Sequence, residues 1–118
     1  MKGDLYFASN SVSSIYSIRS LTNLKEIDAS ENQISDTSAL RNLIHLEDVS
    51  LGNNKISDIS ALSNLINMKY LDLSNNKIED VSPLANLDQL LEVAIIDNPA
   101  DNDELQEKFP HIYEMLVI

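Results

Sequence analysis

The sequence of 118 residues contains no cysteine, so it offers no disulfide framework, no thiolate ligand for a metal and no cysteine nucleophile. It also lacks tryptophan, and only 5% of its residues are aromatic, so aliphatic side chains must fill the interior. No hydrophobic run is long enough to cross a membrane, and the first residues lack the apolar segment of a cleaved signal peptide. We therefore expect a cytoplasmic protein if the chain is complete, and a secreted or surface-attached protein if it is a fragment.

Positive charge is scarce as well. Eight Lys and Arg residues stand against 19 Asp and Glu residues, which gives a formal net charge of −11. Nucleic acid and an anionic membrane would repel such a chain, whereas a basic protein would be attracted to it. We therefore expect a basic protein partner, and neither nucleic acid nor membrane.

Glycine and proline are also few, with two and three residues, although the chain must turn many times. Asparagine, serine and aspartate must therefore supply the turns. The hydrophobic content of 43% indicates a folded protein, and a chain of this length buries about two-thirds of its unfolded surface.

What the sequence does contain is a repeat of 22 residues. Residues 65–86, LINMKYLDLSNNKIEDVSPLAN, align with residues 43–64, LIHLEDVSLGNNKISDISALSN, and with residues 21–42. The same spacing joins a column of asparagines, Asn10, Asn32, Asn54, Asn76 and Asn98. A period of this length is typical of stacked repeats that share one continuous core.

Each unit reads LxxLxxLxLxxNxIxDIxxL, and its alternating LxL segment predicts a short strand with both apolar residues on one face. Six such pairs occur, Leu5/Phe7, Ile27/Ala29, Val49/Leu51, Leu71/Leu73, Val93/Ile95 and Met115/Val117. The connection that follows is too short for a long helix. Stacking the units therefore predicts one parallel sheet with short returns on its opposite side.

The segments NNKISDISALSNL (residues 53–65) and NNKIEDVSPLANL (residues 75–87) resemble leucine-rich repeats of the 22-residue class. They are similar to those of bacterial internalins and of phosphatase-regulator proteins, and the resemblance covers about residues 5–117. It implies an α/β solenoid, a horseshoe with a short-strand parallel sheet on its concave face and turn or 3-10-like returns on its convex face. It also implies protein binding without catalysis.

We expect a single leucine-rich-repeat domain over residues 1–118. It comprises a degenerate, serine-rich first repeat (1–20), regular repeats (21–98) and a C-terminal capping repeat (99–118). In the last unit, Asp101 or Asp103 is suited to begin a short helix over residues 104–109. The chain then returns to strand register and ends on an edge strand.

Two polar columns have structural interpretations. An asparagine amide can donate and accept at once, so the asparagine column is expected to satisfy backbone groups of its own turn and of the next coil. Asp36, Asp58 and Asp80 are expected to cap the turns that follow them. Stacked carboxylates could also hold calcium, but the glycine-aspartate motif of calcium-binding repeats is missing. We predict no metal and no cofactor.

The pattern gives no support for catalysis. His45 and His111 share one register, three coils apart, and no serine or aspartate arrangement near them indicates a triad. A glycine-rich phosphate loop is also missing. We predict that the protein is not an enzyme.

The strand residues that point away from the core are the candidate binding site. They are Asp4, Tyr6, Glu26, Asp28, Asp48, Ser50, Tyr70, Asp72 and Glu92. Like charges on neighbouring strands repel, so keeping them indicates a basic partner, with the tyrosines as anchors. The predicted function is a binding module that holds a basic protein, such as a small bacterial adaptor or an immunity-type antagonist.

Towards the C-terminus the same face becomes apolar, with Ala94, Ile96, Leu116 and Ile118. This patch could form a homo-oligomer, meet a further segment or extend the binding face. The alternative functions are therefore a structural module that self-associates through its C-terminal edge, or a fragment of a surface adhesin of the internalin type.

Overall fold

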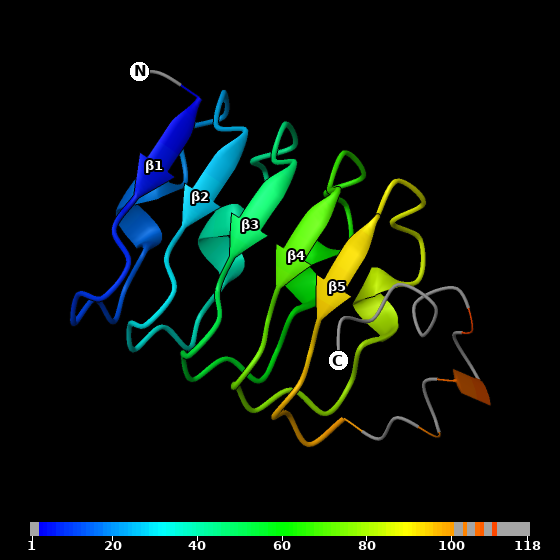
Figure 1. Cartoon of the computed structure of the whole chain (residues 1–118). Helices are drawn as coiled ribbons and strands as arrows, with labels where there is room; N and C mark the ends of the chain where they lie inside the picture. Colours follow the sequence, from blue (N-terminus) through cyan, green and yellow to red (C-terminus); the bar gives the residue numbers. More distant parts are fainter. Residues whose placement is uncertain (1–2, 101–102, 104–105, 108–109, 111–118) are drawn as a thin grey trace.

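The computed structural model describes residues 3–100 together with residues 103, 106, 107 and 110. Five three-residue strands form one sheet: β1 (Asp4–Tyr6), β2 (Glu26–Asp28), β3 (Asp48–Ser50), β4 (Tyr70–Asp72) and β5 (Glu92–Ala94). All neighbours are parallel, in the order β1-β2-β3-β4-β5 (Figure 1). Each residue lies opposite the residue 22 positions later, as Asp4 lies opposite Glu26. Equivalent side chains therefore stack across the sheet.

The returns carry four short 3-10 helices: η1 (Tyr16–Ile18), η2 (Ser38–Leu40), η3 (Ser60–Leu62) and η4 (Ser82–Leu84). They lie on the opposite side of the coil from the strands (Figure 1). This open parallel sheet with 3-10 returns confirms the predicted solenoid. The sixth strand pair, Met115/Val117, and His111 lie outside the described residues. Of the predicted helix over residues 104–109, Gln106 and Glu107 are described, and both are helical.

The core is a stack of aliphatic columns, as expected from the lack of tryptophan. The middle residues of β2 to β5 are at most 3% exposed, and the leucines of the returns, such as Leu43 and Leu65, are fully buried. The first coil differs, because Leu5, Phe7, Val12 and Leu21 are only partly buried against the core. No described residue covers them from the N-terminal side.

The asparagine column links the coils. Asn54 accepts a hydrogen bond at Oδ1 from the backbone N–H of Ile34 (3.0 Å). Its Nδ2 donates to the carbonyls of Ala29 and Leu51 (3.0 Å each). Asn32, Asn76 and Asn98 repeat the pattern. The predicted scaffold role is confirmed. The predicted direction is wrong, because each of these asparagines bonds to its own coil and to the preceding coil, not to the next one.

A further column, of residues with left-handed backbone conformation, was not predicted. The residue before each asparagine has a positive φ between 53° and 60°, and none of the five is glycine: Ser9, Glu31, Asn53, Asn75 and Asp97. Asparagine, aspartate and serine tolerate this left-handed conformation through local hydrogen bonds, which explains how the chain turns with so little glycine. Glu31 is the one residue of this column that is not asparagine, aspartate or serine.

Candidate protein-binding face

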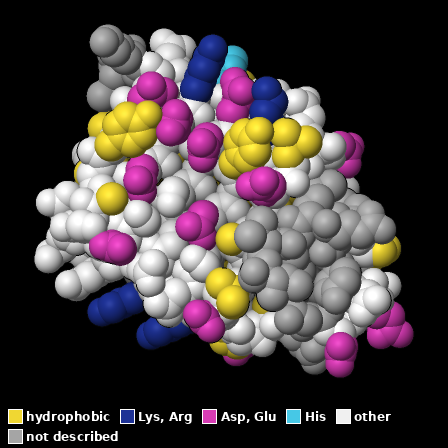
Figure 2. Space-filling view, viewed as in Figure 1, with side chains coloured by type: hydrophobic (Ala, Val, Ile, Leu, Met, Phe, Trp, Pro, Cys, Tyr) yellow, Lys and Arg dark blue, Asp and Glu magenta, His cyan; other side chains and the backbone are white. Residues whose placement is uncertain are grey.

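The outward-pointing residues of the five strands, at the first and third positions of each, form a surface that we call the sheet face. All nine residues predicted as the binding site lie on it, and Ala94 is the tenth. Six of the ten are carboxylates: Asp4, Glu26, Asp28, Asp48, Asp72 and Glu92. None is lysine or arginine. Figure 2 shows Asp and Glu side chains spread over this side, with basic side chains at its margins.

Two of these carboxylates also shape the backbone. Oδ1 of Asp28 accepts hydrogen bonds from the backbone N–H and the hydroxyl of Ser30 (3.1 and 2.7 Å). Asp72 does the same with Ser74 (2.9 and 2.7 Å). A Cβ at Gly52 would lie 3.1 Å from Asp72 Oδ2, so this glycine leaves room for the pair. The prediction missed this role, although the D-x-S spacing signals it.

Asp48 is the carboxylate under most electrostatic pressure. It lies on β3 opposite Glu26, and its side chain is only partly exposed. Partial burial raises the pKa of Asp48, and the charge of Asp28 raises it further. No described residue donates a hydrogen bond to its carboxylate. Its charge therefore has no compensation within the sheet face.

Two tyrosines stand among the carboxylates. Tyr6 at the end of β1 is 60% exposed, and Tyr70 at the start of β4 is 43% exposed. Desolvation, the charge of Asp4 and a hydrogen bond with Glu26 raise the pKa of the Tyr6 phenol. Exposed rings beside negative charge are suited to contact the stem and head of a basic side chain.

The sheet face has a hollow of about 290 Å³ over β3, β4 and β5. Its lining residues are Asp48, Val49, Ser50, Tyr70, Leu71, Asp72, Glu92 and Ala94. Val49 and Leu71 point into the core and line the hollow with their backbone, while Ala94 and the Tyr70 ring give it apolar surface and Asp48, Asp72 and Glu92 give it three carboxylates. This combination suits a long side chain with an apolar stem and a positive end.

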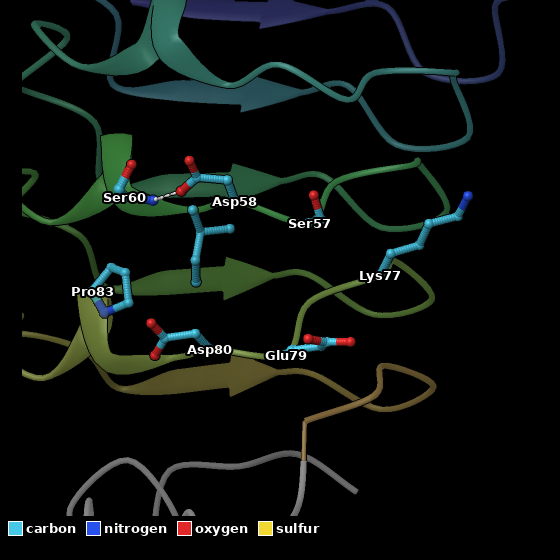
Figure 3. Close-up of a pocket in the computed structure, with 8 residues that line it drawn as sticks. Ser57, Asp58, Ser60, Lys77, Glu79, Asp80 and Pro83 are labelled. Atoms are coloured by element: carbon cyan, nitrogen blue, oxygen red, sulfur yellow. Dashed lines mark hydrogen bonds between the residues drawn. The ribbon is translucent and has the colours of Figure 1, made fainter.

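A second cavity, of about 560 Å³, lies on the return side, lined by Ser57, Asp58, Ile59, Ser60, Lys77, Glu79, Asp80 and Pro83 (Figure 3). Its aspartates serve the backbone. Asp58 accepts the N–H of Ser60 (2.8 Å), and Asp80 accepts that of Ser82 (2.9 Å). Asp36 makes the same bond with Ser38 (2.9 Å). This confirms the predicted capping role of the aspartate column.

Those backbone hydrogen bonds lower the pKa of Asp36 and Asp58, because they stabilise the charged carboxylate. Within the described part of the chain, no group of three or more His, Asp or Glu side chains could hold a metal ion. The return-side cavity therefore contains both basic and acidic side chains, and its Asp58 and Asp80 carboxylates already accept backbone hydrogen bonds. The charged residues of the sheet face are all acidic.

Among the described residues, an ion pair between Lys69 Nζ and Glu47 Oε1 (3.1 Å) lies at the margin of the sheet face. Both residues come just before strands, so the pair lies beside the carboxylates and leaves their charge uncompensated. Exposed apolar residues also lie off the face, because Ile44 and Ile66 are 49% and 57% exposed at equivalent positions. The prediction did not single them out.

The predicted apolar patch is described only in part. Ala94 is partly buried at the end of β5, and Ile96 is 50% exposed just beyond it. Leu116 and Ile118 lie outside the described residues. Self-association through this patch stays a prediction. None of the described residues belongs to a helix long and apolar enough to cross a membrane.

Comparisons with known proteins agree with this geometry. Residues 44–86 match the family model Leucine Rich repeats (2 copies). The structure is similar to an internalin (inlF) from Listeria monocytogenes str. 4b F2365, with 32% identity, a TM-score of 0.70, and coverage of 84% of this chain and 36% of that chain. It is also similar to internalin C2 (inlC2) of the same strain, with 30% identity, a TM-score of 0.84, and coverage of 97% and 50%.

A third similar structure is the leucine-rich-repeat ectodomain of the receptor kinase SOBIR1 from Arabidopsis thaliana. Its identity is 28%, its TM-score is 0.69, and the match covers 79% of this chain and 55% of that chain. The chain thus spans between 36% and 55% of the length of these three relatives. A comparison with curated protein sequences gave no match.

The fold is thus that of a leucine-rich-repeat solenoid, with an open parallel sheet and 3-10 returns. Residues 44–86 are leucine-rich repeats, and the chain is internalin-like in its fold and repeats. Proteins of this kind typically mediate protein–protein interactions, and they are generally non-catalytic binding modules that use the extended concave surface of the solenoid.

Proposed function

We propose that the protein binds a basic protein partner on its sheet face. The observation that carries this proposal is the concentration of six carboxylates, and no basic residue, on the outward strand positions. A face that served only solubility would gain from mixed signs, because stacked like charges destabilise a sheet. Asp48 shows the cost, since its pKa is raised by burial and by Asp28.

Charge complementarity would both speed the encounter with a basic partner and stabilise the complex on the sheet face. A face of one sign steers a basic protein into contact and penalises acidic competitors. Tyr6 and Tyr70 then supply rigid, exposed rings, which are frequent anchors in interfaces. The hollow between Tyr70, Asp48 and Glu92 receives a lysine or arginine side chain of the partner.

The test reverses charge on the face without touching the turns. Glu26→Lys with Asp48→Lys changes two paired positions of β2 and β3, whereas Asp28 and Asp72 are left intact because they bond to serines. We expect the double variant to lose capture of the partner at least tenfold in an affinity pull-down read by mass spectrometry. The proteins lost should be basic.

The matched control is Glu79→Lys with Asp88→Lys, which makes the same change in net charge at exposed positions outside the strands. It should capture the partner as the unmodified chain does. Circular dichroism melting of both variants checks that they are folded. Equal capture by the sheet-face variant and the control would contradict the proposal.

A further inference from the structure

Two turns that lead into the strands carry exposed isoleucines. These turns lie between a 3-10 helix and the next strand, along the margin where the strands begin (Figure 1). Each is closed by a backbone hydrogen bond, as the N–H of Leu46 donates to the carbonyl of Leu43 (3.1 Å). Ile44 is the second residue of this turn, and Ile66 has the same place one coil later. The two side chains are 49% and 57% exposed, and we call the pair the isoleucine ridge.

The repeat does not require an apolar residue at this position. The equivalent residue is Thr22 one coil earlier and Asp88 one coil later, and both are exposed. Polar residues therefore border the ridge on both sides, and the ridge lies on coils that have described neighbours in both directions. Because equivalent residues stack from coil to coil, Ile44 and Ile66 form one patch. An exposed patch that the fold does not need is typical of an interaction site.

The ridge is held in place by the core below it. The leucine that precedes each isoleucine, Leu43 or Leu65, is fully buried. The two turns are also tied together, because Asn67 Nδ2 donates to the carbonyl of Ile44 (2.8 Å). A surface that is already ordered loses little conformational entropy when a partner covers it.

The ridge leads directly onto the sheet face. Three residues after the isoleucines, the same two coils carry Glu47 and Lys69, which form the ion pair at the margin (3.1 Å). The next residues are Asp48 and Tyr70, which line the hollow over β3, β4 and β5. Ile66 and Tyr70 are four residues apart, and a chain of that length spans at most about 14 Å. One segment of a partner can therefore reach both surfaces.

We infer that the isoleucine ridge is the apolar part of the partner-binding surface. Apolar side chains of the basic partner cover Ile44 and Ile66, while one of its basic side chains enters the hollow beside Tyr70. This inference rests on the proposed function and extends the binding surface beyond the sheet face. Burial of apolar surface adds affinity that charge pairs exposed to water do not supply.

Area and charge decide between this partner and a second copy of the chain. Two half-exposed side chains fall far short of the roughly 800 Å² per partner that a stable interface buries, so the ridge needs an adjoining surface. That adjoining surface is acidic, and each copy has a formal net charge of −11. Two copies that met through the ridge would bring like charges together, such as Asp48 and Asp88, whereas a basic partner has the opposite charge.

A pair of synthetic peptides tests the inference on the full chain. One peptide joins two leucines to two lysines through four flexible glycine and serine residues, which span about 14 Å when extended. The other has serines in place of the leucines and the same charge. In a titration followed by NMR of the isoleucine methyl groups, the leucine peptide should bind at least fivefold more tightly and should shift the signals of Ile44 and Ile66. Equal binding of the two peptides would overturn the inference.

Protein variants test the ridge from the other side. Ile44→Thr with Ile66→Thr, the ridge variant, places at both positions the residue type that Thr22 already has in the same turn, and circular dichroism melting checks the fold. The ridge variant should bind both peptides equally, whereas Ile44→Val with Ile66→Val should keep the preference for leucine. Tyr16→Thr removes a side chain that is 62% exposed on the return side, and it should also keep the preference. A fivefold preference in the ridge variant would overturn the inference.

Two further results separate this inference from the proposed function. If Glu26→Lys with Asp48→Lys weakens the binding of both peptides, while leucine gives no advantage on the unmodified chain, the sheet face stands and the ridge fails. If that variant binds the serine peptide as tightly as the unmodified chain does, the proposed function itself fails. Sedimentation that showed dimers broken in the ridge variant would assign the ridge to a second copy and overturn the inference.

Discussion

At the scale of the residue, single side chains satisfy the backbone groups of two coils. The amide of Asn54 bonds to Ile34 and Ala29 in the preceding coil and to Leu51 in its own. The carbonyls of Ala29 and Leu51 also accept from Asn32 and Asn76, so removing the Asn54 amide would leave one buried group, the N–H of Ile34, without a partner. Among the described residues, Asn10 bonds to its own coil alone, through the carbonyls of Phe7 and Ala8, and it is exposed.

Asn54→Ala should therefore lower the free energy of unfolding by about 1–3 kcal/mol, the cost of leaving the buried N–H of Ile34 unsatisfied. Asn10→Ala is the matched control and should cost less than about 1 kcal/mol, because water reaches its partners. Urea denaturation followed by circular dichroism measures both values. Similar losses at the two positions would contradict the role assigned to burial.

Much of this residue-level structure follows from spacing. The 22-residue period places the asparagines and the capping aspartates in columns, and both types have the side-chain groups that such turns need. The left-handed residue could not be found that way, because Glu31 has no local signature of positive φ. Asp28 and Asp72 were assigned to binding alone, since facing outward and bonding to Ser30 and Ser74 are not exclusive.

At the scale of the element, a charged carboxylate stabilises the turns at the 3-10 helices but destabilises the strands. The helices gain from it, because the ionised Asp36 and Asp58 accept backbone N–H groups and their pKa values fall. The strands lose from it, because the ionised Asp48 is partly buried beside Asp28 and its pKa rises. Acidification therefore weakens the helix caps and relieves the sheet.

Asp48→Asn should stabilise the protein at neutral pH. The pKa of Asp48 is raised in the folded state, so its stabilising contribution is complete below the ordinary aspartate value of about 3.9 and is lost as the pH rises through the raised value. The gain in melting temperature should thus be present at pH 7 and vanish in acid. Asp88→Asn, an exposed position off the strands, controls for the loss of one charge. A gain that persists at acid pH would contradict this explanation.

The elements themselves were predictable to different degrees. Alternation of Leu5 with Phe7, or Leu71 with Leu73, defines a strand and its inward face, so the residues of the sheet face follow directly. The partial burial of Leu5 and Phe7 could not be predicted, because a pattern of apolar positions does not show how far each position is covered. That property depends on which coil covers them.

At the scale of the whole molecule, the described basic residues lie off the sheet face, whereas acidic residues lie both on it and on the returns. The outward strand positions are acidic, while Lys25 and Lys69 come just before strands and Lys55 and Lys77 lie on the returns. Under the proposed function, a face of one charge sign attracts and orients a basic partner before contact, so association depends on the long-range field as well as on the contacts.

Association with the partner should therefore slow steeply as salt rises. Between ionic strengths of about 0.1 M and 1 M the screening length falls from about 10 Å to about 3 Å, so the steering field is lost before the contacts are. Surface plasmon resonance should show the association rate falling at least tenfold, with a smaller change in dissociation. The Glu79→Lys with Asp88→Lys variant should retain this dependence. An association rate independent of salt would contradict electrostatic steering.

The asparagine ladder has a consequence for how such a chain changes length. Asn54 reaches back 20 residues to Ile34, and Asn76 reaches back 20 residues to Ile56, with the same bond length of 3.0 Å. A duplicated copy of residues 43–64 would therefore meet, at both of its junctions, the bonds that already join its neighbours. Insertion of a partial unit would change the 20-residue spacing that these bonds span. The family can grow by whole-unit recombination, and each new unit adds a strand of surface on which recognition can diversify.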